Sequence, residues 1–442
     1  MINTTLFPAL DLNPTPTVAV QDTAFAPRVR RPDRAQVLMG PQCLDELVAE
    51  DHDVRQIWGV VERLDLSGFY DCIAARGSVP GRESTDPRLL VALWLYAAVE
   101  GIGSGRYLAE QCRQNAPYRW LCGGVSVNYH TLNDFRVGHE AALDDLFTKI
   151  LAALMSRDVV RVARVSQDGT RVRASAGTGS FRRRGKLEEY LAAAKAHVEA
   201  IKKQADPGAE ESAQRRAARE QAAKSRVKRV EEALAELAKV EQAKAKQDDR
   251  KASKHSEPRA SMTDPEARKM KMSNGGFNPA YNVQIATDVA SRAIVAIDVT
   301  GHGCDTGEDG PLREQIKRRT GRMPPEHLLD GGYINRDNIE KASQDGVAIY
   351  MPLTPTAGGG KVCTEKKGDP PGVAAWRKRM TTEEGKQVYK LRSSTSETVN
   401  ADLKTYRGLG PFRVRGTKKV RCVALWSALA YNVMHFAAIL LS

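Results

Sequence analysis

Three acidic residues carry the chemistry that this sequence suggests. Asp168 and Asp330 each close a strand-like run, spanning residues 159–168 and 326–330, and Glu397 lies near the start of a helical pattern. Carboxylates that meet from two strand ends and a helix repel one another, and metal cations relieve that repulsion. Oxygen ligands suit Mg²⁺ or Mn²⁺, and a pair of such ions is a common device for in-line phosphoryl transfer.

Each acidic residue also has an ordinary structural interpretation. The Asp-Gly dipeptides at 168–169 and 330–331 are typical of tight turns, because both residue types tolerate a positive φ. Ser394 and Glu397 have the spacing of a capping box at a helix start. Taken singly, each segment therefore leaves the structural alternative open.

The composition favours a polyanionic partner. The chain has 442 residues, which predicts two or three domains. Its formal net charge is +13 and its pI is about 9.4, a balance that suits nucleic acid but is shared by ribosomal and membrane-surface proteins. The seven cysteines include no CxxC pair, so neither a zinc module nor a disulfide framework is predicted. Free thiols fit a cytoplasmic location.

Two terminal segments bear on membrane association. Residues 1–32 lack a basic stretch followed by an apolar core, so no signal peptide is predicted. Residues 422–441 are nearly all apolar, and their length alone would allow a membrane helix. Ser427, Asn432 and His435 interrupt the run, and the latter two side chains are costly in lipid. We expect a buried core helix here and no membrane partner.

Residues from about 36 to 155 are expected to be helical. Pro87–Val99 is a strongly apolar helix, with a proline in its first turn and Thr85 or Asp86 as its cap. The short helices that follow are joined by tight turns and resemble a helix-turn-helix. An ordinary bundle with solvated arginines is the alternative. The candidate DNA contacts outside the apolar positions are Arg106, Arg113, Arg119 and Arg136.

The region from about 182 to 254 has a different composition. It is rich in Ala, Lys, Arg, Glu and Gln, and its apolar residues step by three and four. Leu187, Leu191 and Val198 belong to one such series, and a second series follows a break at 206–208. This pattern predicts an antiparallel helical hairpin over residues 186–247.

An α/β pattern surrounds this insertion. Strands are predicted at 281–287, 293–300 and 347–352 in addition to those ending at the two aspartates, with helices at 307–319 and 335–343, a loop at 357–371 and a helical last third. The strands at 281–287 and 293–300 are expected to form an antiparallel hairpin beside parallel strands, which predicts a mixed sheet flanked by helices. His302 and Asp305 follow a strand and are interpreted as loop residues rather than metal ligands.

Several motifs recur in a specific order along the chain. They are Asn128 to Arg136, Asp168-Gly169-Thr170, Tyr281 to Gln284, Asp330-Gly331-Gly332-Tyr333, the set Tyr389, Arg392, Glu397 and Lys404, then Arg415-Gly416 and Tyr431-Asn432. This order resembles that of bacterial insertion-sequence transposases of the DDE class, which have an RNase H-like catalytic domain. The resemblance covers nearly the whole chain. One departure is that Glu397 lies one residue farther from Arg392 than in the form expected of this family.

The resemblance implies an α/β chain with four parts. An extended arm (1–35) and an all-α, helix-turn-helix-like domain (36–155) precede a split RNase H-like catalytic domain (156–181 and 273–442), which a helical insertion and basic linker (182–272) interrupts. The implied metal ligands are Asp168, Asp330 and Glu397, holding two Mg²⁺ or Mn²⁺ ions. The implied further DNA contacts are Arg392, Lys404 and Arg415.

The resemblance also implies a reaction and its partners. Water would attack the phosphodiester at a transposon end, and the freed 3′-hydroxyl would then attack target DNA in line. Double-stranded ends and target are the expected partners, and a homodimer is expected on DNA because two ends must be paired. A nuclease of the same fold that only hydrolyses, and an inactive domesticated DNA-binding scaffold, are the alternatives. An inactive scaffold would be expected to have lost one of the three carboxylates, and none is lost in this sequence.

Overall fold

The computed structural model describes residues 43–73, 84–203, 213–248, 257–353 and 367–442. Three predicted features lie outside these residues: the extended arm at 1–35, the helix break at 206–208 and most of the loop at 357–371. The rest of the chain combines helices with one mixed sheet, so the predicted α/β fold class is confirmed.

A six-stranded mixed sheet organises the site. Its strands are β1 (Arg164–Arg173), β4 (Arg268–Lys271), β5 (Phe277–Asp288), β6 (Ile294–Thr300), β7 (Glu326–Leu328) and β8 (Ala348–Tyr350). The order is β4-β5-β1-β7-β8, and β6 also pairs with β5. Strand β5 runs antiparallel to β1, β4 and β6, whereas β1, β7 and β8 are mutually parallel. Three antiparallel strands followed by two parallel ones is the arrangement expected of an RNase H-like domain. A separate pair is formed by β2 (Phe181–Arg182) and β3 (Ala260–Ser261).

Strand β1 corrects one prediction. The sequence pattern placed a strand over 159–168 with Asp168 at its end, but Val162 has a φ of 56° and the strand begins only at Arg164. Pairing with β5 continues from Val165 to Arg173. Asp168 therefore lies in the middle of a strand, and the Asp-Gly pair at 168–169 is not a hairpin turn.

Side-chain caps mark the start of several N-terminal helices. They are α1 (Asp53–Arg63), α2 (Ser67–Tyr70), α3 (Pro87–Val99), α4 (Gly105–Gln114), α5 (Ala116–Cys122), α6 (Tyr129–Gly138) and α7 (Glu140–Ser156), preceded by a 3₁₀ turn at Asp45–Leu47. Asp86, Ser104 and Asn128 each accept a backbone N–H in the first turn of α3, α4 and α6. The predicted all-α region before the sheet is confirmed.

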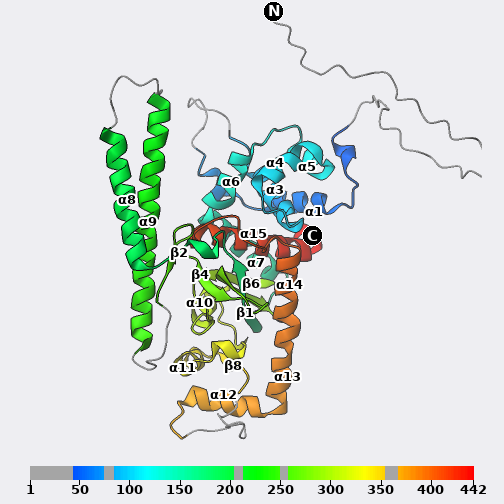
Figure 1. Cartoon of the computed structure of the whole chain (residues 1–442). Helices are drawn as coiled ribbons and strands as arrows, with labels where there is room; N and C mark the ends of the chain where they lie inside the picture. The colour runs from blue at the N-terminus through cyan, green and yellow to red at the C-terminus, as the bar shows by residue number, and fades with distance from the viewer. Residues whose placement is uncertain (1–42, 74–83, 204–212, 249–256, 354–366) are drawn as a thin grey trace, which may run out of the picture. The chain divides into compact units, whose positions relative to one another are not determined.

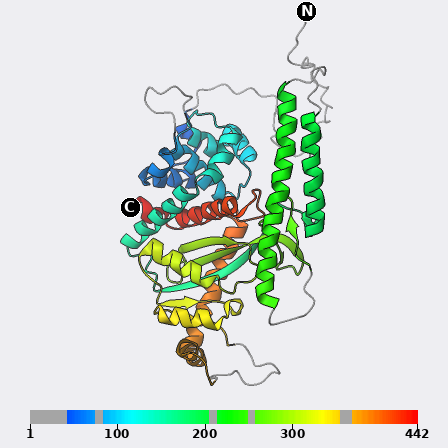
Figure 2. The ribbon, with the colours of Figure 1, turned by 90° about the vertical axis from the view of Figure 1, so that its left-hand side faces the viewer.

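Helix α15 (Thr417–His435) joins these helices to the sheet. It packs against α3, α6 and α7 on one side and against β6 on the other, as Figure 2 shows for the red helix between the blue-to-cyan helices and the green sheet. Asn432 is fully buried and pairs with the backbone N–H and C=O of Ile294. Together with α16 (Ala437–Leu441), this segment is a core element. Among the described residues, no helix has the length and apolarity needed to cross a membrane.

The insertion forms a helical hairpin, as predicted. Helices α8 (Arg184–Lys203) and α9 (Ala213–Asp248) lie side by side, drawn in green in Figure 1. Near its base, Leu187 packs with Leu237 of α9 and Ala260 of β3. Farther out, Val198 and Ile201 form a small separate cluster with Ala223. The helical periodicity in the sequence therefore buries residues mainly within the hairpin itself.

The remaining helices are α10 (Asp309–Thr320), α11 (Arg336–Gln344), α12 (Pro371–Thr381), α13 (Glu383–Arg392) and α14 (Thr398–Thr405), with 3₁₀ turns at Thr178–Ser180 and Gly331–Tyr333. Of these helices, α10 packs against β6 and α7, whereas α11, α12 and α13 pack against β8 of the parallel half of the sheet. A π-helical turn, Ser393–Glu397, connects α13 directly to α14, so the two form the continuous orange helix of Figure 1. Glu397 therefore lies inside a long helix, and the capping box that was the structural alternative at Ser394 is not formed.

Candidate active site

Two of the predicted acidic residues stand side by side at the parallel edge of β1. Strands β1 and β7 pair as Arg164↔Glu326 and Ser166↔Leu328, and the same register carried two residues on matches Asp168 with Asp330. Asp330 contributes to raising the pKa of Asp168, so the two carboxylates are close enough to interact. Asp330 follows β7 in extended conformation, and its side chain accepts the Gly332 N–H at 2.7 Å at the start of a 3₁₀ turn.

The helix that carries Glu397 is fastened to the same strand. The Ser396 and Ser166 hydroxyls hydrogen-bond at 2.5 Å in a buried contact. One turn farther along the helix, the Asn400 amide donates to Asp168 Oδ2 at 3.0 Å. These two contacts place Glu397 beside the Asp168 face of the sheet, with 64% of its side chain exposed.

The π-helical turn explains the unusual spacing in this helix. Glu397 is five residues from Arg392, one more than the family form predicts. A π-turn closes hydrogen bonds over five residues instead of four, so it takes up one extra residue without ending the helix. Residues five apart then share a face, and Arg392 Nη2 lies 3.8 Å from Glu397 Oε1. Turns of this kind are frequent at functional sites.

Arg392 lies between two of the three carboxylates. Its Nη1 is 3.7 Å from Asp168 Oδ1 on the side opposite Glu397, and its side chain is 16% exposed. Both distances are too long for good hydrogen bonds, and Nη1 has no hydrogen-bond partner among the described residues. The guanidinium thus balances negative charge without being tightly bound to either acid.

The electrostatics of Asp168 show that this balance is incomplete. Burial raises the pKa of Asp168 to about 6, Arg392 opposes this shift, and Asp330 and Asp305 add to it. A carboxyl that resists ionisation in this way is stabilised by additional positive charge. The all-oxygen side chains of Asp168, Asp330 and Glu397 suit a hard divalent cation, so the donor set fits Mg²⁺ or Mn²⁺. Among the described residues, no three Asp, Glu, His or Cys side chains converge closely enough to hold an ion as they stand.

The predicted DNA contacts occupy several elements. Lys404 is exposed two turns after Glu397 and lies within electrostatic range of Asp168. Arg415 is exposed after α14 and donates to the Ser175 carbonyl at 3.2 Å. In the helical region Arg106 is exposed above the Tyr129 ring, Arg113 is exposed at the end of α4, and Arg119 of α5 is half-buried.

Arg136 is the exception, because the prediction that it lies outside the apolar positions is wrong. Its residue is 7% exposed, its guanidinium lies 4.5 Å from the Trp94 ring centre, and Nη1 donates to the Gly103 carbonyl at 2.7 Å. Burial and nearby Arg413 lower the pKa of Arg136 to about 10. The long stem of arginine allows such burial where helical periodicity predicts a surface position. Arg136 is a core residue in this structure, so we do not propose it as a DNA contact.

One further carboxylate lies at the site, and the sequence interpretation passed over it. Asp305, from the loop after β6, accepts hydrogen bonds from Asn282 and Gln284 of β5 and raises the pKa of Asp168. Its loop partner His302 instead pairs with Glu308 at 2.6 Å and is 74% exposed. The local sequence gives no sign that Asp305 lies at the site and His302 does not, because only the fold of the loop brings Asp305 to β1.

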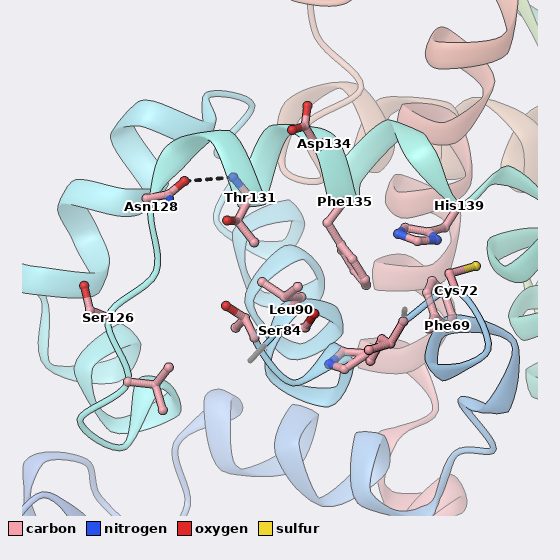
Figure 3. A pocket seen from close by; sticks show the side chains of 14 residues that line it. Phe69, Cys72, Ser84, Leu90, Ser126, Asn128, Thr131, Asp134, Phe135 and His139 are labelled. Carbon is pink, nitrogen blue, oxygen red and sulfur yellow. Dashed lines mark hydrogen bonds between the residues drawn. The ribbon is translucent and has the colours of Figure 1, made fainter. Parts of the chain in front are cut away.

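A second hollow lies in the helical region, between α2, α3 and α6 (Figure 3). Its volume is about 980 Å³, and its wall includes Phe69, Leu90 and Phe135 with the polar groups of Asp134 and His139. Ile73 and Ser84 also line it. It lacks the paired carboxylates of the β1 edge.

Two segments of the chain match family models of transposase domains. Residues 42–137 match a transposase domain (DUF772), and residues 371–437 match a transposase DDE domain. Glu397 lies within the second match, whereas Asp168 and Asp330 lie between the two. No curated protein and no solved structure matches the chain significantly.

The two matches, together with the α/β fold, support an insertion-sequence transposase with a DDE domain. They support a transposase function and imply that the substrate is DNA.

Proposed function

We propose that this transposase cleaves DNA at transposon ends and joins the freed 3′-hydroxyl to target DNA, using Asp168, Asp330 and Glu397 as ligands of two divalent cations. The observation that carries the proposal is the β1–β7 register, which when continued brings Asp330 level with Asp168, together with the fastening of the Glu397 helix to β1. The DDE-domain match around Glu397 supports the same assignment.

The chemistry divides between the ions and the chain. When bound, Mg²⁺ or Mn²⁺ ions supply a nucleophile of lowered pKa and stabilise the leaving oxygen of an in-line displacement. Asp168, Asp330 and Glu397 would hold these ions, and Asp168 is less exposed than Glu397. The Asn400 amide orients Asp168 through its contact with Oδ2, and the Gly332 N–H orients Asp330.

Arg392 would change partner when the site is loaded. In the structure its guanidinium lies between Asp168 and Glu397 and balances their charge. Cations held by the same acids would repel it, and a DNA phosphate beside the site offers a bidentate partner in exchange. Lys404, on the same helix, would contact a neighbouring phosphate.

DNA recognition would involve the basic residues outside the metal centre. Arg106 and Arg113 on α4, Arg119 on α5 and Arg415 before α15 would contact phosphates of the duplex. Two ends must be held together for transposition, so we expect a homodimer on DNA. The site of action would be the bacterial cytoplasm.

Strand transfer is the experiment that tests this function against hydrolysis alone. Inverted repeats that flank the coding region supply the substrate, offered either intact or with a free 3′-hydroxyl. We expect metal-dependent nicking of the intact ends and joining of the pre-cut ends to a target plasmid. Nicking without joining would indicate a nuclease of the same fold, and neither activity in an end-binding protein would indicate an inactive scaffold.

A further inference from the structure

We propose that Asp305 is a fourth carboxylate of the metal centre and shares a divalent cation with Asp330. The proposal rests on the metal-dependent reaction proposed above and adds a ligand beyond the three acidic residues. Asp305 lies in the loop between β6 and α10, and 13% of its side chain is exposed.

Buried amides hold one oxygen of Asp305 in place. Oδ1 accepts hydrogen bonds from Asn282 Nδ2 at 2.7 Å and from Gln284 Nε2 at 2.8 Å. The Tyr333 hydroxyl in turn donates to Gln284 Oε1. The motif on β5 and the motif that begins at Asp330 therefore converge on Asp305. A carboxylate with one oxygen fixed by donors presents the other in a defined direction, as ligands supported by neighbouring hydrogen bonds do.

The other oxygen approaches Asp330. A Cβ built on Gly332 would lie 3.0 Å from Asp330 Oδ1 and 3.6 Å from Asp305 Oδ2, so both oxygens lie near one point. The Thr306 hydroxyl fixes the loop there by donating to the Gly332 carbonyl at 3.0 Å. Arg171 Nη2 is 3.9 Å from Asp305 Oδ2, too far for a hydrogen bond.

Gly169 shows how closely Asp305 is packed against β1. A Cβ at position 169 would lie 2.2 Å from Asp305 Oδ1 and 2.4 Å from Gln284 Nε2, so no side chain fits there. The glycine after Asp168 is thus required by the approach of a carboxylate and not by a turn. Because Gly169 has no side chain, Asp305 can lie against the strand that carries Asp168.

An independent observation points to a missing donor at this place. Asn282 is fully buried, and its Oδ1 has no hydrogen-bond partner among the described residues. That oxygen lies 2.9 Å from the same position above Gly169 that the Asp305 carboxylate approaches. A buried acceptor without a donor costs about 1–3 kcal/mol, and water on a cation held by Asp305 would supply the donor. Divalent cations such as Mg²⁺ usually retain several waters.

Manganese binding to the full-length protein without DNA tests the proposal. Mn²⁺ would be titrated into wild type, Asp305→Asn and Asp168→Asn, with free Mn²⁺ followed by electron paramagnetic resonance. We expect Asp305→Asn to weaken one binding event by about 10- to 100-fold, the range found when groups supporting a metal site are removed. Glu314→Gln removes an exposed carboxylate of α10 and should leave binding unchanged.

A second variant tests the geometry while keeping every charge. Gly169→Ala would displace the Asp305 carboxylate, so it should weaken Mn²⁺ binding as Asp305→Asn does. Wild-type Mn²⁺ affinity and stoichiometry in both variants would overturn the proposal. An Asp305→Asn protein that is unfolded in EDTA would also overturn it, because the carboxylate would then have a structural role. If wild type itself bound no Mn²⁺, the metal-dependent function would fail first; if Asp168→Asn alone weakened binding, only the role of Asp305 would fail.

Discussion

Asp330 lies two residues beyond the end of β7, level with Asp168 of β1 when the register set by Arg164↔Glu326 and Ser166↔Leu328 is continued. This match places two carboxylates at the edge where β7 ends and β1 continues. The catalytic assignment therefore depends on the unequal lengths of these two strands.

The first prediction concerns the three proposed ligands. Asp168→Asn, Asp330→Asn and Glu397→Gln keep side-chain shape but remove the charge that would hold a cation, so each should abolish end cleavage. Binding to end DNA should persist, because it depends on arginines elsewhere, and should fall steeply with salt. Gel-shift and cleavage assays on the same preparations separate the two properties. Wild-type cleavage in any one variant would remove that residue from the centre.

The second prediction is a pH dependence in EDTA. The pKa of Asp168 is raised to about 6 in the fold, above the roughly 3.9 of an unfolded chain. Ionised Asp168 therefore opposes folding, so its unfavourable contribution is present above pH 6 and disappears as the pH falls toward 4. Asp168→Asn should raise the free energy of unfolding by about 2–3 kcal/mol at pH 8, and the gap should close near pH 4. Urea unfolding at both pH values measures it; equal stabilities at pH 8 would contradict it.

The third prediction concerns Arg392 as an internal counter-charge. Arg392→Ala leaves Asp168 beside Asp330 without its nearest cation, so the metal-free protein should melt at a lower temperature. Mg²⁺ should then stabilise the variant more than wild type, because bound ions no longer displace a guanidinium. Thermal unfolding in EDTA and in Mg²⁺ gives both values, with exposed Lys390→Ala as the matched control. An identical Mg²⁺ shift in variant and wild type would argue against this role.

The fourth prediction concerns the core contact of α15. Asn432→Ala would leave the N–H and C=O of Ile294 buried without partners. We expect a loss of about 2–4 kcal/mol in the free energy of unfolding, because each unsatisfied group retains its desolvation cost. Ser427→Ala on the same helix removes only a bond to the Val423 carbonyl and should cost less than about 1 kcal/mol. Equal losses in urea unfolding would count against the special role of Asn432.

The fifth prediction separates two arginines that look alike in sequence. Arg106→Ala should weaken end binding and reduce the salt dependence by about one phosphate contact, with stability unchanged. Arg136→Ala should instead lower stability, because it removes the contacts with Trp94 and the Gly103 carbonyl. Salt-titrated binding and thermal unfolding on both proteins distinguish the outcomes. A stable Arg136→Ala with a reduced salt slope would show that this side chain reaches DNA.

Local sequence pattern alone determined many of the elements. Asp86, one of the two predicted caps, begins α3, because a capping side chain competes only with water for nearby N–H groups. The periodicity of Leu187 and its neighbours likewise predicted the helical hairpin, since a helix buries residues at fixed intervals. The fold class and the transposase resemblance also followed from residue order.

Contacts between distant segments decided the rest. The extent of β1 through Asp168 depends on pairing with β5, more than 100 residues later. Arg136 is buried because Trp94 and Gly103 receive it, and Asp305 joins the site because Gly169 leaves space for its carboxylate. None of these partners is near in sequence. Local sequence patterns indicate which secondary structure a segment prefers. Which residues are buried, and which charges lie close together, depends on distant segments that pack against it in the folded chain.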